Sequence, residues 1–177
     1  MEQILDIIKR RASVRAYLDK PLPEEVITNI MEAARHTPTA RNLQELEYKV
    51  ITNKALIQKA SDSVAAALAE QDRPVQPKYR PSFFYSAPLL IIIAGPRDNY
   101  WVNTDAALAV QNIMLYATSI DLGSCFIGMA RFIESDPKMI EELHIAGDMR
   151  IAAAVVCGYP NENPAPIEKI LNVEFFT

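Results

Sequence analysis

The densest group of side chains that could do chemistry lies near the N-terminus, where three arginines and a serine occur within residues 9–15. The chain after residue 11 is predicted to be extended, and alternate side chains of an extended segment point to one side. Arg11, Ser13 and Arg15 would then face one ligand, with Arg10 beside them. Guanidinium and hydroxyl groups suit phosphate oxygens, which arginine can bind bidentately. The pattern is suited to a phosphate site, but a solvated basic edge that balances nearby acids stays open as the alternative.

A second polar segment, residues 38–44, follows about one helix later. Pro38, Thr39 and Asn42 are turn-forming residues, and the amides and carbonyls of such a turn can bond the polar edge of a heterocycle. An ordinary loop that ends a helix has the same composition, so this alternative stays open. Taken with the arginine cluster, the loop suggests a phosphorylated, planar cofactor.

The remaining candidates for chemistry are weaker. Gly123 and Gly128 bracket a turn of small residues, and glycine permits close approach of the backbone to a ligand, although the sequence alone favours a plain turn. No dinucleotide-binding or P-loop glycine pattern is present. The two histidines lack partners at metal-ligand spacing. Cys125 and Cys157 are far apart, and we expect both to be reduced, with Cys125 a small buried residue.

Composition limits the classes of function. The chain has 177 residues, a net charge of −4 and a pI near 5.3, which argues against nucleic acid or an acidic membrane as a partner. The longest apolar run, residues 88–94, is far shorter than a membrane span. The first residues are acidic and lack the apolar core of a signal peptide, so we expect a cytoplasmic protein.

The length and the lack of repeats or of a separating linker predict one domain over residues 1–177, and hydrophobic periodicity predicts its elements. Helices are expected at 1–10, from 21 to 37, at 53–69, at 101–120 and at 135–143; strands are expected at 47–52, 89–94, within 123–128 and at 150–158. The helix at 101–120 is apolar on nearly every side, which predicts a central position or a subunit contact. Residues 71–81 are expected to form an exposed loop that could act as a lid. Residues 161–177 are expected to form an extended tail.

Five motifs, in order along nearly the whole chain, resemble those of the FMN-dependent nitroreductases. They are the segment from Arg10 to Arg15; the loop 38–44; residues 105–117 with Gln111 and Asn112; residues 122–128, Leu-Gly-Ser-Cys-Phe-Ile-Gly; and Gly158-Tyr159-Pro160. Three positions depart from the family pattern. Glu45-Leu46 replaces Pro-Trp, Ala107 replaces a glycine, and Lys169 alone stands where the family often has a basic pair.

The resemblance implies a compact α+β fold with a central mixed or antiparallel sheet flanked by helices, in an intertwined homodimer. The tail 161–177 would pack on the partner subunit. Two FMN sites would lie at the subunit interface. Arg10, Arg11, Ser13 and Lys169 would hold the phosphate, and Arg15 would lie near N1 and O2 of the flavin. Residues lining the ring would be Pro38, Thr39, Ala40, Asn42 and Gln44 from the other subunit, with Gly123 and Ser124 near N5.

The activity that the resemblance implies is hydride transfer from NAD(P)H to FMN, followed by ping-pong reduction of a small aromatic acceptor: a nitroaromatic compound, a quinone or free flavin. The flavin carries the chemistry, and no catalytic side chain or metal is expected. Three alternatives remain: a flavin carrier or sensor without turnover; a relative that catalyses ene reduction, dehalogenation or flavin fragmentation; and a cofactor-free protein that keeps only the fold.

Overall fold

A four-stranded antiparallel sheet forms the centre of the computed structural model, which describes residues 4–74, 82–165 and 167–176. The strands are β1 (Glu47–Ile51), β2 (Leu89–Pro96), β3 (Gly123–Phe126) and β4 (Met149–Gly158). Their order across the sheet is β1-β2-β4-β3, and every neighbouring pair is antiparallel. β3 and β1 are therefore the two edges. The predicted α+β class, with an antiparallel sheet flanked by helices, is confirmed.

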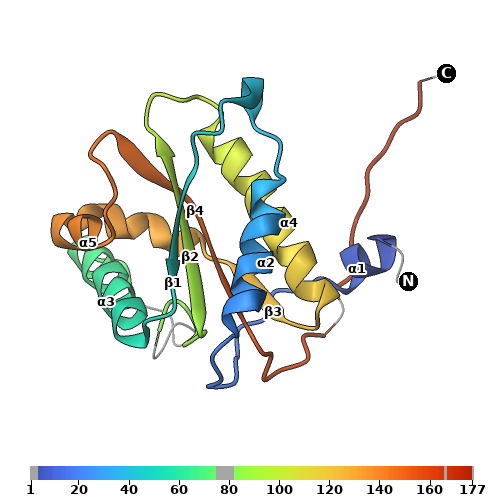
Figure 1. Ribbon diagram of the computed structural model, residues 1–177, viewed down its shortest axis with the longest axis horizontal. Helices are drawn as coiled ribbons and strands as arrows, with labels where there is room; N and C mark the ends of the chain where they lie inside the picture. The colour runs from blue at the N-terminus through green and yellow to red at the C-terminus, as the bar shows by residue number, and fades with distance from the viewer. Residues whose placement is uncertain (1–3, 75–81, 166, 177) are drawn as a thin grey trace.

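Helices cover both faces of this sheet (Figure 1). α3 (Lys54–Glu70), α5 (Pro137–Glu142) and the 3₁₀ segment η3 (Gly128–Ser135) pack on one face; α2 (Glu24–Arg35) and α4 (Val102–Ser119) pack on the other. Successive residues of β2 point to opposite faces, Leu90 and Ile92 to the first and Ile91 and Ile93 to the second. All four are fully buried, which explains why this strand is continuously apolar.

Local sequence signals explain where several helices begin. Asn53 caps α3, because its side chain accepts a hydrogen bond from the amide of Leu56 at 3.1 Å. Asp136 caps α5 through the amides of Lys138 and Met139, with Pro137 in the first turn. α2 follows Pro23 and carries two glutamates in its first turn. The elements predicted from periodicity occur at the expected places, with ends shifted by a few residues.

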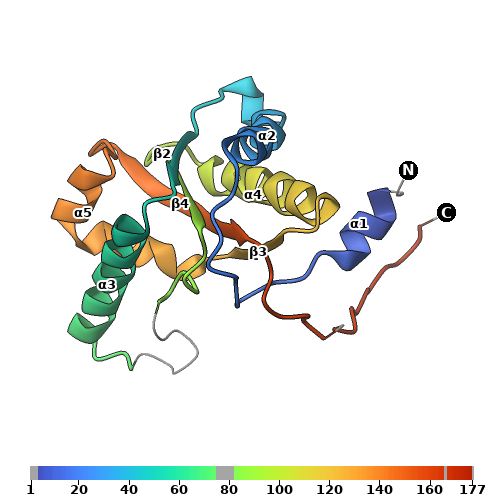
Figure 2. The same cartoon turned by 60° about the horizontal axis from the view of Figure 1, so that its bottom comes forward.

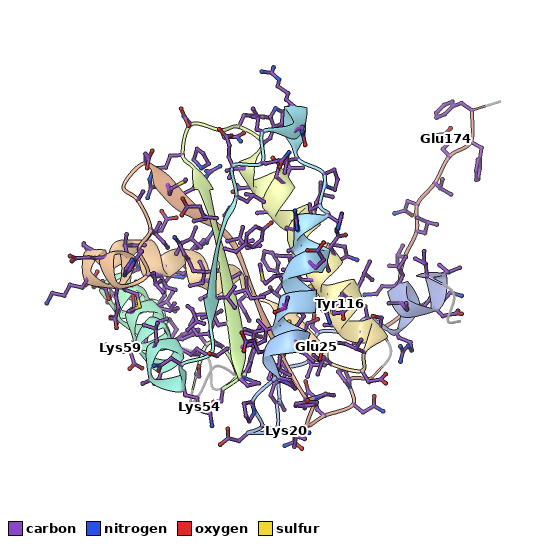
Figure 3. The ribbon with its side chains drawn as sticks, viewed as in Figure 1. Lys20, Glu25, Lys54, Lys59, Tyr116 and Glu174 are labelled. Carbon is purple, nitrogen blue, oxygen red and sulfur yellow. The ribbon has the colours of Figure 1, made fainter. Side chains whose placement is uncertain are left out.

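Two terminal segments extend from one side of the molecule. The short helix α1 (Ile4–Arg10) buries none of its residues, and the tail beyond residue 161 runs outward without regular structure (Figures 1 and 2). Glu174 lies near the outer end of this tail, away from the sheet and its helices (Figure 3). Large apolar side chains of both segments are exposed: Ile4, Leu5 and Ile8 of α1, and Ile167, Ile170, Leu171, Val173, Phe175 and Phe176 of the tail.

α4 is less enclosed than its apolar sequence suggests. Its inner face is buried on the sheet, whereas Leu108 and the preceding Trp101 stay 42% and 46% exposed. A single chain therefore leaves apolar surface uncovered on α4, α1 and the tail. Most of the predicted lid, residues 75–81, lies outside the described residues, so the lid stays a prediction.

Candidate functional site

The arginine-rich segment runs beside the edge strand β3. Ser13 and Ser124 form a parallel β-bridge, and the amide of Val14 donates to the carbonyl of Ser124 at 3.0 Å. Further along, the amide of Leu18 donates to the carbonyl of Tyr159 at 2.9 Å. The segment is thus extended, as predicted. It lies between β3 and the chain that leaves β4.

Gly123 is what allows this close approach. A Cβ atom at this position would stand 2.8 Å from side-chain carbons of Val14, a separation that real Cβ atoms essentially never show. The next residue, Ser124, has a buried hydroxyl with no hydrogen-bond partner among the described residues. A buried polar atom without a partner costs free energy. The Ser124 hydroxyl is therefore an unsatisfied polar group at the contact between two of the five sequence motifs.

Three predicted phosphate and flavin contacts lie around the thiol of Cys125. Burial raises the pKa of this thiol, while the charges of Arg15 and Arg11 and a hydrogen bond with Ser13 act in the opposite direction. The balance is a raised pKa, so the thiol is protonated near neutral pH. Cys125 is 3% exposed, and neither cysteine forms a disulfide. The structure thus brings Arg11, Ser13 and Arg15 together, with Cys125 as a small buried neighbour.

Arg15 has two neighbours that the sequence analysis did not single out. Its amide donates to the carboxylate of Glu162, and its side chain interacts with Tyr85. Partial burial lowers the pKa of Arg15, but the neighbouring Cys125, Tyr85 and Glu162 raise it by more. The guanidinium is therefore a fixed positive charge. In the sequence, only one feature could have indicated the contact of Glu162 with Arg15. Glu162 comes two residues after Pro160, which ends the last of the five motifs.

Arg10 points elsewhere. Its guanidinium donates to the carboxylate of Asp121 at 3.2 Å and to the carbonyl of Thr118 at 3.1 Å, at the C-terminal end of α4. A cation is favourable there because of the exposed carbonyls and the helix dipole. In this structure the hydrogen bonds of Arg10 connect α1 to the end of α4. Its predicted contact with phosphate stays a prediction.

The loop 38–44 is held by bonds within itself and by one buried carboxylate. The Thr39 hydroxyl accepts from the amide of Gln44 at 3.1 Å, and the Gln44 side chain donates to Asn42 at 2.8 Å. The amide of Ala40 donates to Asp105, which is 4% exposed, at 3.0 Å. Backbone φ angles near +55° at Arg41, Asn42 and Gln44 make the turn tight.

Within one chain, this loop and the arginine segment lie at opposite ends of α4. Asp105 in the first turn holds the loop, whereas Thr118 in the last turn contacts Arg10. Thirteen residues of α-helix separate these two anchors, a distance of about 20 Å. Figure 1 shows the same separation, with the loop above α2 and the segment after α1 beside β3.

The last predicted residue, Lys169, lies exposed in the tail. Among the described residues, no cluster of three or more histidine, cysteine or acidic side chains could hold a metal ion. The same described ranges contain no helix long and apolar enough to cross a membrane.

Comparison with known proteins matches residues 8–159 to the family model described as the nitroreductase family. The chain belongs to the nitroreductase family. A Methanothermobacter thermautotrophicus protein, provisionally named NADH dehydrogenase/NAD(P)H nitroreductase, is 30% identical over 167 residues, covering 91% of this chain and 79% of its own. The nitroreductase assignment confirms the resemblance found in the sequence.

Solved nitroreductase structures have the same fold. The nitroreductase from Bacteroides fragilis with bound FMN superimposes with a TM-score of 0.86 at 25% identity, covering all of this chain and 98% of its own. The nitroreductase from Desulfitobacterium hafniense, also with bound FMN, superimposes with a TM-score of 0.86 at 25% identity, covering 98% of this chain and 100% of its own. The family match ends at residue 159, so Glu162 and Lys169 lie beyond it.

Proposed function

We propose that this chain is an FMN-dependent oxidoreductase that takes hydride from NAD(P)H and passes electrons to small aromatic acceptors. The observation that carries the proposal is the contact between Ser13 and Ser124, which joins two motifs 111 residues apart through a glycine that admits no side chain. FMN-bound nitroreductases of the same fold support the choice of cofactor. When bound, FMN supplies the transfer of hydride and electrons.

The residues present fit a phosphorylated flavin. Within the described residues, the Arg11 guanidinium makes no hydrogen bond or ion pair, and the half-buried Ser13 lies close by. Charge-assisted hydrogen bonds from such groups to phosphate are among the stronger ones in proteins. Ser124 would contact the ring through its backbone, because its hydroxyl is buried. In this proposal Arg11 and Ser13 hold the phosphate, and Gly123 and Ser124 line the ring.

Arg15 would act on the electronics of the cofactor rather than as an acid or base. Its neighbours keep the pKa raised, so it carries a positive charge at any working pH. A fixed positive charge at the pyrimidine edge of the flavin favours the form that carries more negative charge. The amide bond to Glu162 would keep Arg15 in place.

A homodimer would complete the site. The loop 38–44 and the arginine segment lie at opposite ends of α4, so the loop of one subunit and the segment of another could reach one flavin where a single chain separates them. The exposed apolar residues of α1, α4 and the tail supply surface for such an interface. We propose that the tail packs on the partner and that Lys169 reaches the phosphate from there.

Steady-state kinetics test the activity. We expect NAD(P)H oxidation that depends on an added nitroaromatic compound, quinone or free flavin. Because both substrates would use the same face of the cofactor in turn, double-reciprocal plots at several acceptor concentrations should be parallel. A yellow protein that oxidises no NAD(P)H with any of these acceptors would be a carrier or sensor. Intersecting lines would contradict the ping-pong order.

A further inference from the structure

An arginine-rich groove adjoins the candidate flavin site and shares Phe126, Ile127 and Gly128 with the motif 122–128. This groove, with a volume of about 730 Å³, is lined by Arg73, Arg97, Arg131 and Arg150 together with aromatic and acidic residues of β3 and η3. Its size is within the range of small-molecule sites. None of the residues predicted to bind FMN lines it. Four cationic side chains in one groove are unexpected in a chain whose net charge is −4.

The guanidinium groups of two of the arginines each contact the same aromatic ring. The guanidinium carbon of Arg131 lies 5.0 Å from the centroid of the Phe132 ring, and that of Arg73 lies 5.4 Å from it. Phe132 is itself only 8% exposed. Two like charges are thus held near each other by cation–π contacts. An anion that contacts both guanidinium groups would offset their like charge.

Among the described residues that line the groove, Glu134 is the only carboxylate that opposes these charges. Glu134 accepts from Arg97 at 3.2 Å, and its other oxygen accepts from the amide of Ile151 at 2.5 Å. The Nε atom of Arg150, next to that amide in sequence, is buried without a hydrogen-bond partner in the described structure. An unsatisfied buried donor on a charged group is costly, so negative charge bound near Arg150 would be favourable.

The groove also has an apolar wall. Phe126, the last residue of β3, lines it and stays 46% exposed. An exposed aromatic ring beside arginines offers a stacking surface for a planar base, while guanidinium groups bind phosphate.

We propose that this arginine groove binds a phosphate-bearing nucleotide, with its phosphates on the arginines and its base against Phe126. Two sources of that chemistry exist: the adenosine phosphate portion of NAD(P)H, or a separate adenine nucleotide. The proposal rests on the groove itself and does not require that the chain bind FMN.

Isothermal titration of the purified protein, with whatever flavin it carries, tests the groove directly. We expect ADP to bind saturably, inorganic pyrophosphate to bind more weakly, and adenosine to bind more weakly still. Arg131→Gln and Arg73→Gln should each weaken ADP binding by about tenfold, the scale of a lost charged hydrogen bond. Both side chains are exposed, so the variants should fold. Arg35→Gln, on α2, makes the same charge change outside the groove and should leave ADP binding unchanged.

The KM and kcat for NAD(P)H identify which nucleotide uses the groove. If Arg131→Gln raises the KM for NAD(P)H by a similar factor at constant kcat, the nucleotide is the reductant. If the KM stays constant while ADP binding weakens, a separate nucleotide uses the groove. The proposal is overturned if ADP does not bind, or if both arginine variants bind ADP as the unmodified chain does.

Discussion

Arg10 and Arg11 are neighbours in sequence, but their guanidinium groups have different roles in the structure. Arg10 is bonded to the end of α4, through Asp121 and the carbonyl of Thr118. The Arg11 guanidinium makes no hydrogen bond or ion pair with the described residues, and it lies near Cys125 with Ser13. A cation without a partner beside a hydroxyl is suited to an anionic ligand.

We therefore predict that Arg11→Gln weakens the binding of FMN by about 1–3 kcal/mol, the scale of a lost hydrogen bond to a charged group. Quenching of flavin fluorescence during titration measures the dissociation constant. Arg35→Gln, which removes the same charge from the exposed face of α2, is the control. Equal dissociation constants for Arg11→Gln and the control would remove Arg11 from the phosphate site.

At the level of elements, the contact between the arginine segment and β3 depends on Gly123. Gly123→Ala would place a methyl group 2.8 Å from Val14, so the segment would have to move away from the strand. We predict a loss of about 1–3 kcal/mol in the free energy of unfolding, as for other overpacked sites, together with weaker FMN binding.

Gly147→Ala is the matched control, because a Cβ atom there would meet nothing within 4 Å. Denaturant unfolding and flavin titration of both variants give the comparison. If Gly123→Ala unfolds and binds FMN as Gly147→Ala does, the close approach seen here has no role in forming the site.

The elements themselves could be predicted from the sequence, because their signals are local. The apolar runs of β2 and β4 and the caps of α3 and α5 all involve residues close together in the chain. The sequence could not show which of its segments would contact one another in the fold. The bonding of Arg10 to α4 and the approach of Glu162 to Arg15 span more than 100 residues and depend on how the layers stack.

The candidate site could be named only in part for the same reason. Resemblance to the nitroreductases supplied the motifs, and the structure places Ser13 beside Ser124. Residue spacing alone did not indicate Tyr85, which follows the residues 75–81 that the structure leaves undescribed, or the arginine groove. Arg73, Arg97, Arg131 and Arg150 come from four separate stretches of chain, so no sequence pattern joins them.

For the whole molecule, the exposed apolar residues of α1 and the tail predict assembly. If each flavin site uses the loop 38–44 of one subunit and the arginine segment of the other, dilution to the monomer should release FMN. Sedimentation velocity with flavin absorbance, over a range of protein concentrations, follows dissociation to the monomer and release of FMN together. FMN that remains on a monomer would contradict a shared site and would place the loop outside it.

We propose that the arginine segment and β3 together hold FMN that NAD(P)H can reduce. The most direct test is the visible absorption spectrum of the purified protein, taken with added FMN and unbound flavin removed, before and after anaerobic addition of NAD(P)H. We expect the bands of bound oxidised flavin, followed by bleaching. A preparation that stays colourless after incubation with excess FMN would contradict it.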